Sequence, residues 1–297
     1  MKYKYFTCDV FTKTRFGGNP LAVLPNAEGL SAQQMQKIAR EFNYSETAFV
    51  LPCKNGYTNN VRIFTPTIEV PFAGHPNIGT AFTLASMGKF GRFHDKIDVV
   101  FEQNAGPVPI AIRSTDAGFW CELKAPEPLS TSQAISPDLI ASAISLPSKD
   151  IVTSTHQPQV ASVGLPFIMV ELKDLAALEA AKTYLPAINE IDARGITPDI
   201  LVYIRSDEEF DIRARVFAPL DNVPEDPATG SANCALVAML TQYQSDSEGM
   251  FEWRIAQGVE MGRPSLLEAR VAKQAGTVTN VWIGGHCKMV AEGYIQV

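Results

Sequence analysis

The chain has 297 residues, 46% of them hydrophobic and 19% charged, which is the composition of an ordinary soluble globular protein. Its length exceeds one typical hydrophobic core and predicts two domains. The net charge is −7 and Lys and Arg form no cluster, which argues against a nucleic-acid partner because phosphate binding requires a basic face.

The first half of the chain alternates strands and helices. In chain order we predict a strand at Lys4–Val10, a glycine-rich turn at Arg15–Asn19, a strand at Pro20–Leu24, a helix at Ser31–Phe42, a strand at Thr47–Leu51 and a helix at Pro76–Met87. Ser31 and Gln34 have the spacing of a capping box, and apolar residues follow at helical intervals, so the first helix is expected to be amphipathic. Pro76 at the first position and Gly88 beyond the end bound the second helix.

The second half contains the same kinds of element. In chain order we predict a strand at Phe119–Leu123, a linker at Pro126–Ser132, a short helix from Ser136, a strand at Ile168–Leu172, a helix at Leu175–Tyr184, a strand at Leu201–Ile204 and a helix at Ser231–Leu240. The helices at Pro76–Met87 and Ser231–Leu240 are apolar around most of their circumference, which is typical of buried helices. Each half is therefore predicted to be a rolled sheet wrapped around one buried helix.

A short sequence pattern occurs twice in the chain. Val61–Pro66 reappears as Ala214–Pro219, and after three further residues Val70-Pro71 is matched by Val223-Pro224. The offset is 153 residues in both cases (214 − 61 and 223 − 70), close to half of the 297 residues. The repeat predicts two structurally equivalent halves, with a site where the loops after the pattern face each other.

Each copy of the pattern leads into the start of a buried helix. Gly74-His75-Pro76 precedes the first helix and Thr229-Gly230-Ser231 the second. A helix start offers unpaired N–H groups and partial positive charge, so two such starts are suited to hold a small anionic substrate such as a carboxylate. The alternative is that Ser231 only caps its helix and His75 only bonds locally.

Two carboxylates stand at places where their role is open. Asp226 either stabilises the start of the second helix or sets the protonation of a partner, and its equivalent in the first half is Ala73 at the offset of 153, so the fold does not require it. Glu46 enters an apolar strand. It is either a rim side chain in solvent or lies in a dry cleft, where desolvation would raise its pKa and make it a general acid and base.

The sequence offers no site for a metal, a nucleotide cofactor or a membrane. The four histidines, His75, His94, His156 and His286, have no metal-ligand spacing, and no glycine-rich nucleotide motif is present. No apolar run approaches the roughly 20 residues that cross a bilayer, and the N-terminus lacks the apolar core of a signal peptide. Five scattered cysteines are typical of reduced thiols, so we expect a cytoplasmic protein.

Several motifs, in order along the chain, resemble those of the PhzF-like (phenazine biosynthesis) isomerase family. They are Phe16-Gly17-Gly18-Asn19-Pro20, Ser45-Glu46-Thr47-Ala48-Phe49, Phe72-Ala73-Gly74-His75-Pro76, Asp226-Pro227-Ala228-Thr229-Gly230-Ser231-Ala232 and Met261-Gly262-Arg263-Pro264-Ser265. The resemblance implies the diaminopimelate epimerase-like fold, an α+β fold of two pseudo-symmetric domains, each a barrel-like and mostly antiparallel sheet around a central helix. We expect an N-terminal domain at residues 1–118, completed by a strand at 288–297, and a C-terminal domain at residues 119–287, with the active-site cleft between them.

The resemblance also assigns roles to individual residues. It implies that Glu46 is the acid and base that moves a proton on the substrate, and that His75 and Asp226 act beside it in catalysis. Ser231 would line the cleft, and Asn19, Gly74 and Gly230 are the other expected substrate-binding residues. No cofactor is expected, and the resemblance implies a homodimer.

Three functions are compatible with these residues. The first is a cofactor-independent isomerase acting on a small carboxylate-bearing substrate. The second is a racemase or epimerase of an amino or hydroxy acid, although the paired thiols of cysteine-dependent relatives are replaced here by Ala73 and by Asp226 or Pro227. The third is a binding protein on the same scaffold that has lost activity.

Overall fold

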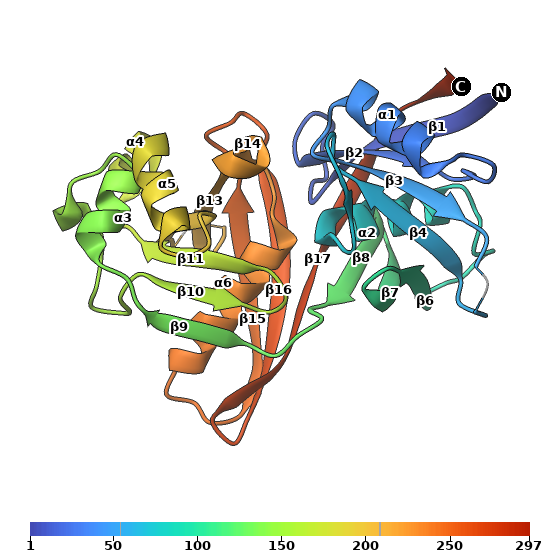
Figure 1. Cartoon of the computed structure of the whole chain (residues 1–297). Coiled ribbons are helices and arrows are strands. Elements are labelled where there is room, and N and C mark those ends of the chain that lie inside the picture. Colours follow the sequence, from blue (N-terminus) through green and yellow to red (C-terminus); the bar gives the residue numbers. More distant parts are fainter. Residues whose placement is uncertain (54, 208) are drawn as a thin grey trace. The chain divides into compact units, whose positions relative to one another are not determined.

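The computed structural model describes residues 1–53, 55–207 and 209–297, and the chain divides into two units (Figure 1). The first unit comprises Met1–Lys124 and Gly284–Val297, and the second comprises Ala125–Ile283. The expected division placed residues 119–124 and 284–287 in the second half, whereas their contacts belong to the first unit.

The first unit is a ring of strands with one helix inside it. Its elements are β1 (Lys2–Val10), β2 (Asn19–Leu24), α1 (Ala32–Phe42), β3 (Glu46–Leu51), β4 (Asn59–Phe64), β5 (Glu69–Val70), α2 (Gly74–Ser86), β6 (Lys96–Gln103), β7 (Gly106–Thr115), β8 (Gly118–Lys124) and the C-terminal part of β17 (Thr277–Gln296). β2 and β3 are parallel, as are β4 and β6, whereas the pairs β1–β17, β1–β2, β3–β4, β4–β5, β6–β7 and β7–β8 are antiparallel. Since β17 pairs with both β1 and β8, the sheet closes on itself.

The helix α2 fills the interior of this ring. It packs against β1, β2, β3, β7 and β8 and is buried from His75 to Ala85 (Figure 1). Gly79 allows the helix to approach the strands closely, because a Cβ at this position would come within 2.5 Å of Leu21 Cδ2 and 2.7 Å of Val10 Cγ2. On the outer face of the sheet, the amphipathic α1 buries Met35 and Ile38, and the predicted capping box of Ser31 is confirmed.

The second unit repeats the same strand order. Its elements are β9 (Ser130–Ala134), α3 (Pro137–Ala143), η1 (Ser148–Asp150), β10 (Gln159–Ser162), β11 (Pro166–Glu171), α4 (Leu175–Ala180), α5 (Leu185–Ala193), β12 (Ile200–Arg205), β13 (Ile212–Ala218), η2 (Pro219–Asp221), β14 (Val223–Asp226), α6 (Gly230–Tyr243), β15 (Gly249–Gln257), β16 (Ser265–Gln274) and the start of β17. β11 and β12 are parallel, β12 and β13 antiparallel, and β13 and β15 parallel, as in the first unit. The predicted duplication is therefore present in the topology.

The helix α6 lies against β10, β11, β15 and β16 and is almost completely buried. The helices α3, α4 and α5 contribute to a second apolar cluster, which packs on β11 and β12 (Figure 1). Each unit is thus a mixed sheet rolled around one buried helix, as the apolar circumference of the two helices predicted.

Two local predictions in the second half are wrong. The helix expected at Leu175–Tyr184 ends at Ala180, because Arg215 Nη1 binds the carbonyl oxygens of Leu178 and Ala181 and satisfies the helix end there. The linker expected at Pro126–Ser132 extends only to Leu129, since β9 begins at Ser130 and pairs with β10. All five residues of β9 are exposed, so its sequence has no alternation of apolar side chains from which a strand could be predicted.

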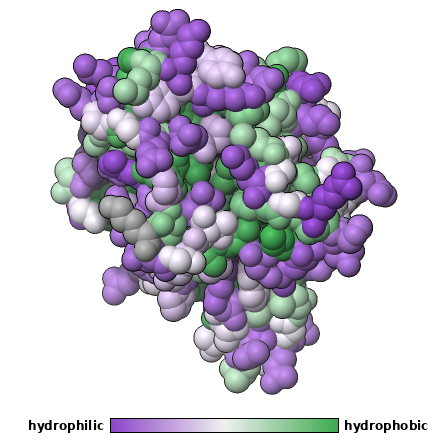
Figure 2. All heavy atoms as spheres, turned by 90° about the vertical axis from the view of Figure 1, so that its right-hand side faces the viewer, coloured by the Kyte–Doolittle hydropathy of each residue, from purple (hydrophilic) through white to green (hydrophobic). Residues whose placement is uncertain are grey.

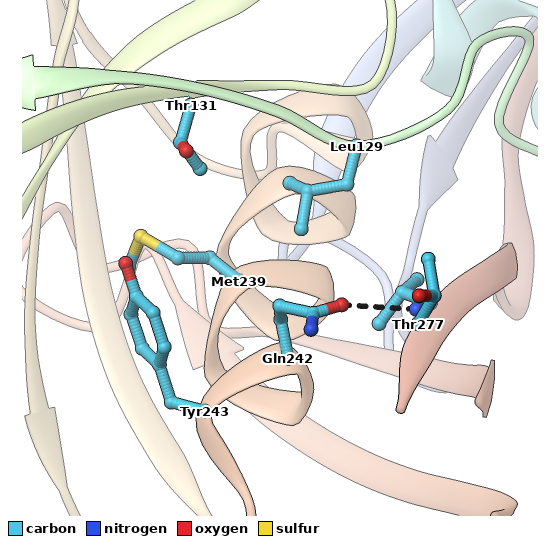
Figure 3. Close-up of a pocket in the computed structure, with 7 residues that line it drawn as sticks. Leu129, Thr131, Met239, Gln242, Tyr243 and Thr277 are labelled. Carbon is cyan, nitrogen blue, oxygen red and sulfur yellow. Dashed lines mark hydrogen bonds between the residues drawn. The ribbon is translucent and has the colours of Figure 1, made fainter. Parts of the chain in front are cut away.

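A small pocket opens in the second unit at the C-terminal end of α6 (Figure 3). It has a volume of 180 Å³ and is lined by Leu129, Thr131, Met239, Gln242, Tyr243, Thr277 and Val278. Because α6 has 14 residues, about 20 Å separate this pocket from the helix start at Gly230. It therefore contains none of the residues predicted to form a site.

Figure 2 shows one face, on which hydrophilic side chains predominate and apolar surface is gathered near the middle of the view. None of the helices that the structure describes has the length and apolar character needed to cross a bilayer. All five cysteines are free thiols.

The close approach at Gly79 predicts that alanine is destabilising there. Alanine is normally the better helix former by roughly 1 kcal/mol, but the added methyl group overpacks the core at a cost of about 1–3 kcal/mol. We therefore expect Gly79→Ala to lower the free energy of urea unfolding. Ser86→Ala, at the exposed end of α2, is the control and should leave stability nearly unchanged. Equal stability of Gly79→Ala and the wild type would contradict the packing described here.

Candidate active site

Glu46 is the first residue of β3 and lies beside Leu21 of the parallel strand β2. Although 19% of its side chain is exposed, its Oε2 atom is buried and has no hydrogen-bond partner among the described residues. The burial of this oxygen is not that of a rim side chain in solvent. A buried carboxylate oxygen without a donor is costly, so the arrangement favours the protonated form.

The environment of Glu46 shifts its proton affinity towards neutrality. Burial raises the pKa of this carboxyl from 4.5 to about 7, and a hydrogen bond with Ser45 lowers it in part. Ser45 Oγ is also 3.2 Å from Asn19 Oδ1, so its single proton serves either the carboxyl or this amide, and the hydroxyl lies between Glu46 and the glycine-rich turn before β2. The sequence placed Asn19 and Glu46 in separate motifs, and the structure brings them together through Ser45.

His75 lies close to Glu46. It is the second residue of α2 and is 6% exposed, and its Nε2 atom is 3.5 Å from Glu46 Oε2. The residue before the helix, Ala73, has no side chain that caps it. The start of α2 at Gly74 therefore combines N–H groups that no cap side chain satisfies with a buried histidine and a buried glutamate.

The turn that leads to Asn19 is held in an unusual backbone conformation. Phe16 has a φ of +70°, which is strained for a bulky residue, and its N–H donates to Asp9 Oδ2 at 2.7 Å. Gly18 has a φ of +64°, and a Cβ there would lie 2.3 Å from Val10 O. Gly18 is therefore required by the backbone geometry of this turn, and Asn19, which follows it, is completely buried at the start of β2.

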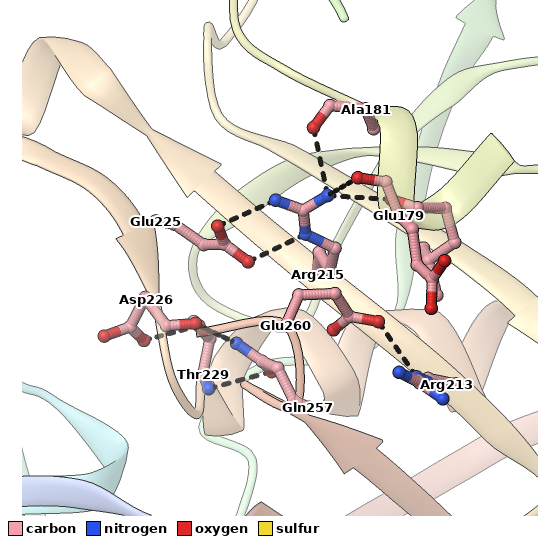
Figure 4. A network of polar contacts seen from close by, with 10 residues as sticks. Glu179, Ala181, Arg213, Arg215, Glu225, Asp226, Thr229, Gln257 and Glu260 are labelled. Carbon is pink, nitrogen blue, oxygen red and sulfur yellow. Dashed lines mark hydrogen bonds and ion pairs between the residues drawn. The ribbon is translucent and has the colours of Figure 1, made fainter. Parts of the chain in front are cut away.

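A polar network surrounds the start of α6 in the second unit (Figure 4). Thr229 Oγ1 donates to Asp226 Oδ2 at 2.5 Å. Gln257, at the end of β15, accepts from the Thr229 N–H at 3.1 Å and donates to Asp226 O at 2.7 Å. Ser231 is half-buried in the first turn of α6, and the side chain of Thr229 does not cap the helix.

The offset between equivalent residues of the two units is not 153 throughout. Arg62 binds both oxygens of Glu69 in the first unit, at 2.7 and 2.6 Å, and Arg215 binds both oxygens of Glu225 in the second, at 2.8 and 2.9 Å. The arginines are 153 residues apart (215 − 62), but the glutamates are 156 apart (225 − 69). Three extra residues therefore lie between β13 and Glu225, where η2 occurs.

This insertion corrects the equivalent of Asp226. By strand pairing, Asp226 lies opposite Val216, as Val70 lies opposite Ile63 in the first unit. The counterpart of Asp226 is thus Val70 and not Ala73, and Ala73 corresponds instead to Thr229, the residue before α6. A valine at the equivalent place still means that the scaffold does not require the carboxylate.

The motif at Met261–Ser265 packs against the loop between Asp226 and Thr229. Ser265 Oγ donates to Pro227 O at 2.8 Å. Gly258 has a φ of +73°, and a Cβ there would lie 2.6 Å from both Pro227 O and Arg263 O. The segment from Gly258 to Ser265 therefore packs tightly against the backbone that carries Asp226 and Thr229.

Sequence reasoning missed the buried amides at both helix starts. Asn77 donates to Ala73 O at 2.9 Å and interacts with Gln103, while Asn233 donates to Thr229 O at 2.9 Å and to Gln257 Oε1 at 2.6 Å. A signal was present in the repeat, because Gly-x-x-Asn opens both helices. Among the described residues, no three His, Cys, Asp or Glu side chains gather as metal ligands do.

Comparison with known proteins places the chain in a recognised group. A family model described as "Phenazine biosynthesis-like protein" matches residues 8–293. An uncharacterized isomerase of Mesorhizobium japonicum is 37% identical over 302 residues, which cover 99% of this chain and 98% of the relative. A trans-2,3-dihydro-3-hydroxyanthranilate isomerase of Pseudomonas aeruginosa is 34% identical over 292 residues, which cover 98% of each.

The fold is matched by solved structures. The crystal structure of a PhzF-family phenazine biosynthesis protein of Bacillus anthracis has a TM-score of 0.91 at 24% identity and covers 100% of both chains. This likeness confirms the α+β fold of rolled sheets around buried helices that the sequence predicted.

The raised pKa of Glu46 predicts how stability depends on pH. Between pH 4.5 and about 7 the folded protein holds a proton on Glu46 that the unfolded chain releases, so this group lowers stability as pH rises through that window. The full penalty above pH 7 is roughly 3 kcal/mol. We expect Glu46→Gln, which does not titrate, to be more stable than the wild type in urea unfolding at pH 8.

The advantage of Glu46→Gln should shrink as pH falls and vanish near pH 4.5. Glu41→Gln makes the same chemical change on an exposed glutamate of α1 and should follow the wild type at every pH. A difference between Glu46→Gln and wild type that does not vary with pH would show that burial does not control this carboxyl.

Proposed function

Because the chain belongs to the phenazine biosynthesis-like family and is an isomerase, we propose that it moves a proton on a small carboxylate-bearing substrate without a cofactor, using Glu46 as general acid and base. The observation that carries this proposal is the buried Oε2 atom of Glu46, which lacks a hydrogen-bond partner among the described residues on a carboxyl whose pKa is raised to about 7. A group with this pKa takes up and returns a proton with comparable ease at neutral pH.

His75 supports the same chemistry. With its Nε2 atom 3.5 Å from Glu46 Oε2, its ring is within reach of the atoms that Glu46 would protonate or deprotonate. A histidine at the start of a helix also experiences the partial positive charge of the helix end. We propose that His75 orients the reacting part of the substrate, or the developing charge on it, while Glu46 moves the proton.

The substrate carboxylate has suitable donors at the helix starts. No cap side chain satisfies the first turn of α2 at Gly74 or of α6 at Gly230. N–H groups in such positions bind carboxylates well. In the first unit we propose that Gly74 binds the anionic group, with Asn19 as a polar neighbour. In the second unit we propose Gly230, Ser231 and Asp226 as substrate-binding residues.

The named relatives suggest which substrate to test first. The Pseudomonas aeruginosa relative is a trans-2,3-dihydro-3-hydroxyanthranilate isomerase, so this compound is our first candidate. We also propose that the protein is cytoplasmic, in keeping with its five free thiols, and a homodimer. Light scattering of the purified protein tests the dimer directly.

Incubation in D₂O separates isomerisation from epimerisation. A single base that takes a hydrogen and returns it elsewhere on the substrate retains part of the original hydrogen in the product. Two opposed bases, as in a racemase or epimerase, exchange that hydrogen for deuterium from solvent. Mass spectrometry of the product after partial turnover therefore decides between the two reactions.

Substitution of Glu46 tests its role. We expect Glu46→Gln to fold and to bind substrate but to lose turnover by about 10²–10⁴-fold, because general acid–base catalysis contributes that much. Glu41→Gln, on the exposed face of α1, should retain the wild-type rate. Wild-type kcat for Glu46→Gln on a genuine substrate would refute the proposed role of this residue.

A further inference from the structure

The side-chain amide of Gln257 has only one possible orientation. Its Oε1 atom accepts from the Thr229 N–H, which cannot accept, and its Nε2 atom donates to Asp226 O, which cannot donate. Asn233 Nδ2, a donor, also lies 2.6 Å from Oε1. Since Gln257 is completely buried, no solvent competes for these bonds, and backbone groups alone fix which end of the amide is which.

This orientation determines where the hydroxyl proton of Thr229 points. Gln257 Nε2 lies 3.1 Å from Thr229 Oγ1 and donates to it. The hydroxyl therefore uses its single proton on its other neighbour, Asp226 Oδ2, at 2.5 Å (Figure 4). Asp226 Oδ2 is therefore the acceptor in this chain of bonds.

From this geometry we infer that Thr229 and Gln257 are positioning residues that stabilise the ionised form of Asp226 for the proposed reaction. A hydrogen bond donated to a carboxylate stabilises its charged form. Asp226 would then present a constant negative charge, while Glu46 is the carboxyl that changes its protonation. The inference rests on the proposed function only for its use in catalysis, because the relay itself is a property of the folded chain.

Three arginines belong to the strands and loop around Asp226, namely Arg213, Arg215 and Arg263. Arg215 is engaged with Glu225, and Arg213 with Glu260 at 2.9 Å, so both arginines of β13 face other carboxylates. Arg263 follows β15 in the loop that packs against the backbone of Pro227, and its carbonyl oxygen lies close to Gly258. Removal of the Thr229 hydroxyl takes one donor from Asp226 Oδ2 and leaves all three arginines in place.

The first unit supplies a matched comparison. Gln103 occupies the place of Gln257 and bonds to Asn77, which corresponds to Asn233, but Ala73 stands where Thr229 would be and Val70 where Asp226 would be. The same buried amide pair thus supports a helix start without any carboxylate. Loss of Gln103 removes a structural bond of the same kind and leaves the relay untouched.

Titration of Asp226 in the substrate-free protein tests the inference. The protein is labelled with ¹³C at aspartate carboxyls, and the Asp226 resonance is assigned by its absence from Asp226→Asn. In Thr229→Val, which keeps the side-chain shape but loses the hydroxyl, we expect the titration midpoint of Asp226 to rise by about one pH unit, a tenfold change in proton affinity. Thr229→Ser keeps the hydroxyl and should restore the wild-type midpoint.

Changes at the two glutamines separate the relay from general support of the helix. Gln257→Met should raise the midpoint as well, because Thr229 is then free to turn its proton elsewhere, and it also serves if Thr229→Val does not fold. Gln103→Met should lower stability without moving the midpoint. An unchanged midpoint in both Thr229→Val and Gln257→Met, or an equal rise in Gln103→Met, would overturn the inference.

These outcomes are distinguishable from failure of the proposed function, since the titration requires no substrate. Where turnover is measured, the acidic limb of the pH profile of kcat/KM should move with the NMR midpoint in Thr229→Val and stay in place in Thr229→Ser. A shifted midpoint with an unshifted limb would remove the positioning role of Thr229 in catalysis.

Discussion

The structure depends on enclosing an apolar helix within a rolled sheet. A helix in that position has no water to hydrogen-bond with the polar groups at its start. The partners for these groups must therefore come from the chain itself. In both units a buried Asn–Gln pair supplies part of this need, with Asn77 and Gln103 in one and Asn233 and Gln257 in the other. These amides connect the helix start to the end of β6 in the first unit and to the end of β15 in the second. β6 runs parallel to β4, and β15 runs parallel to β13.

This shared support makes each helix start a place where polar side chains are tolerated inside an apolar core. The first unit places His75 there, and Glu46 reaches it from β3. The second unit places Thr229 there, and Asp226 precedes it on β14. Duplication therefore preserved the scaffold of amides and arginine–glutamate pairs, and the two copies diverged in the side chains that surround it.

The sequence predicted the parts of the fold that repeat or show a strong periodicity. The capping box of Ser31, the two buried helices and the topological duplication follow from local signals, and the structure has all of them. The exposed strand β9 and the break between α4 and α5 were not predictable, since an edge strand needs no apolar alternation and Arg215 ends α4 from a distant strand. The true counterpart of Asp226 was hidden because a chance Val-Pro match masked a three-residue insertion, which only strand pairing revealed.

For the site, the sequence showed which residue types are present but not the environment of each side chain. Sequence alone could not decide whether Glu46 is dry, since the oxygen atoms of one carboxyl can differ in exposure while the residue as a whole is 19% exposed. The two carboxyls differ in their hydrogen-bond donors, which their sequence context does not show. The Thr229 hydroxyl donates to Asp226 Oδ2, whereas Oε2 of Glu46 has no donor among the described residues. In the proposed reaction this difference gives the two carboxyls different roles. A carboxyl that must exchange a proton near neutral pH needs a poorly solvated oxygen, and one that supplies constant charge needs a donor.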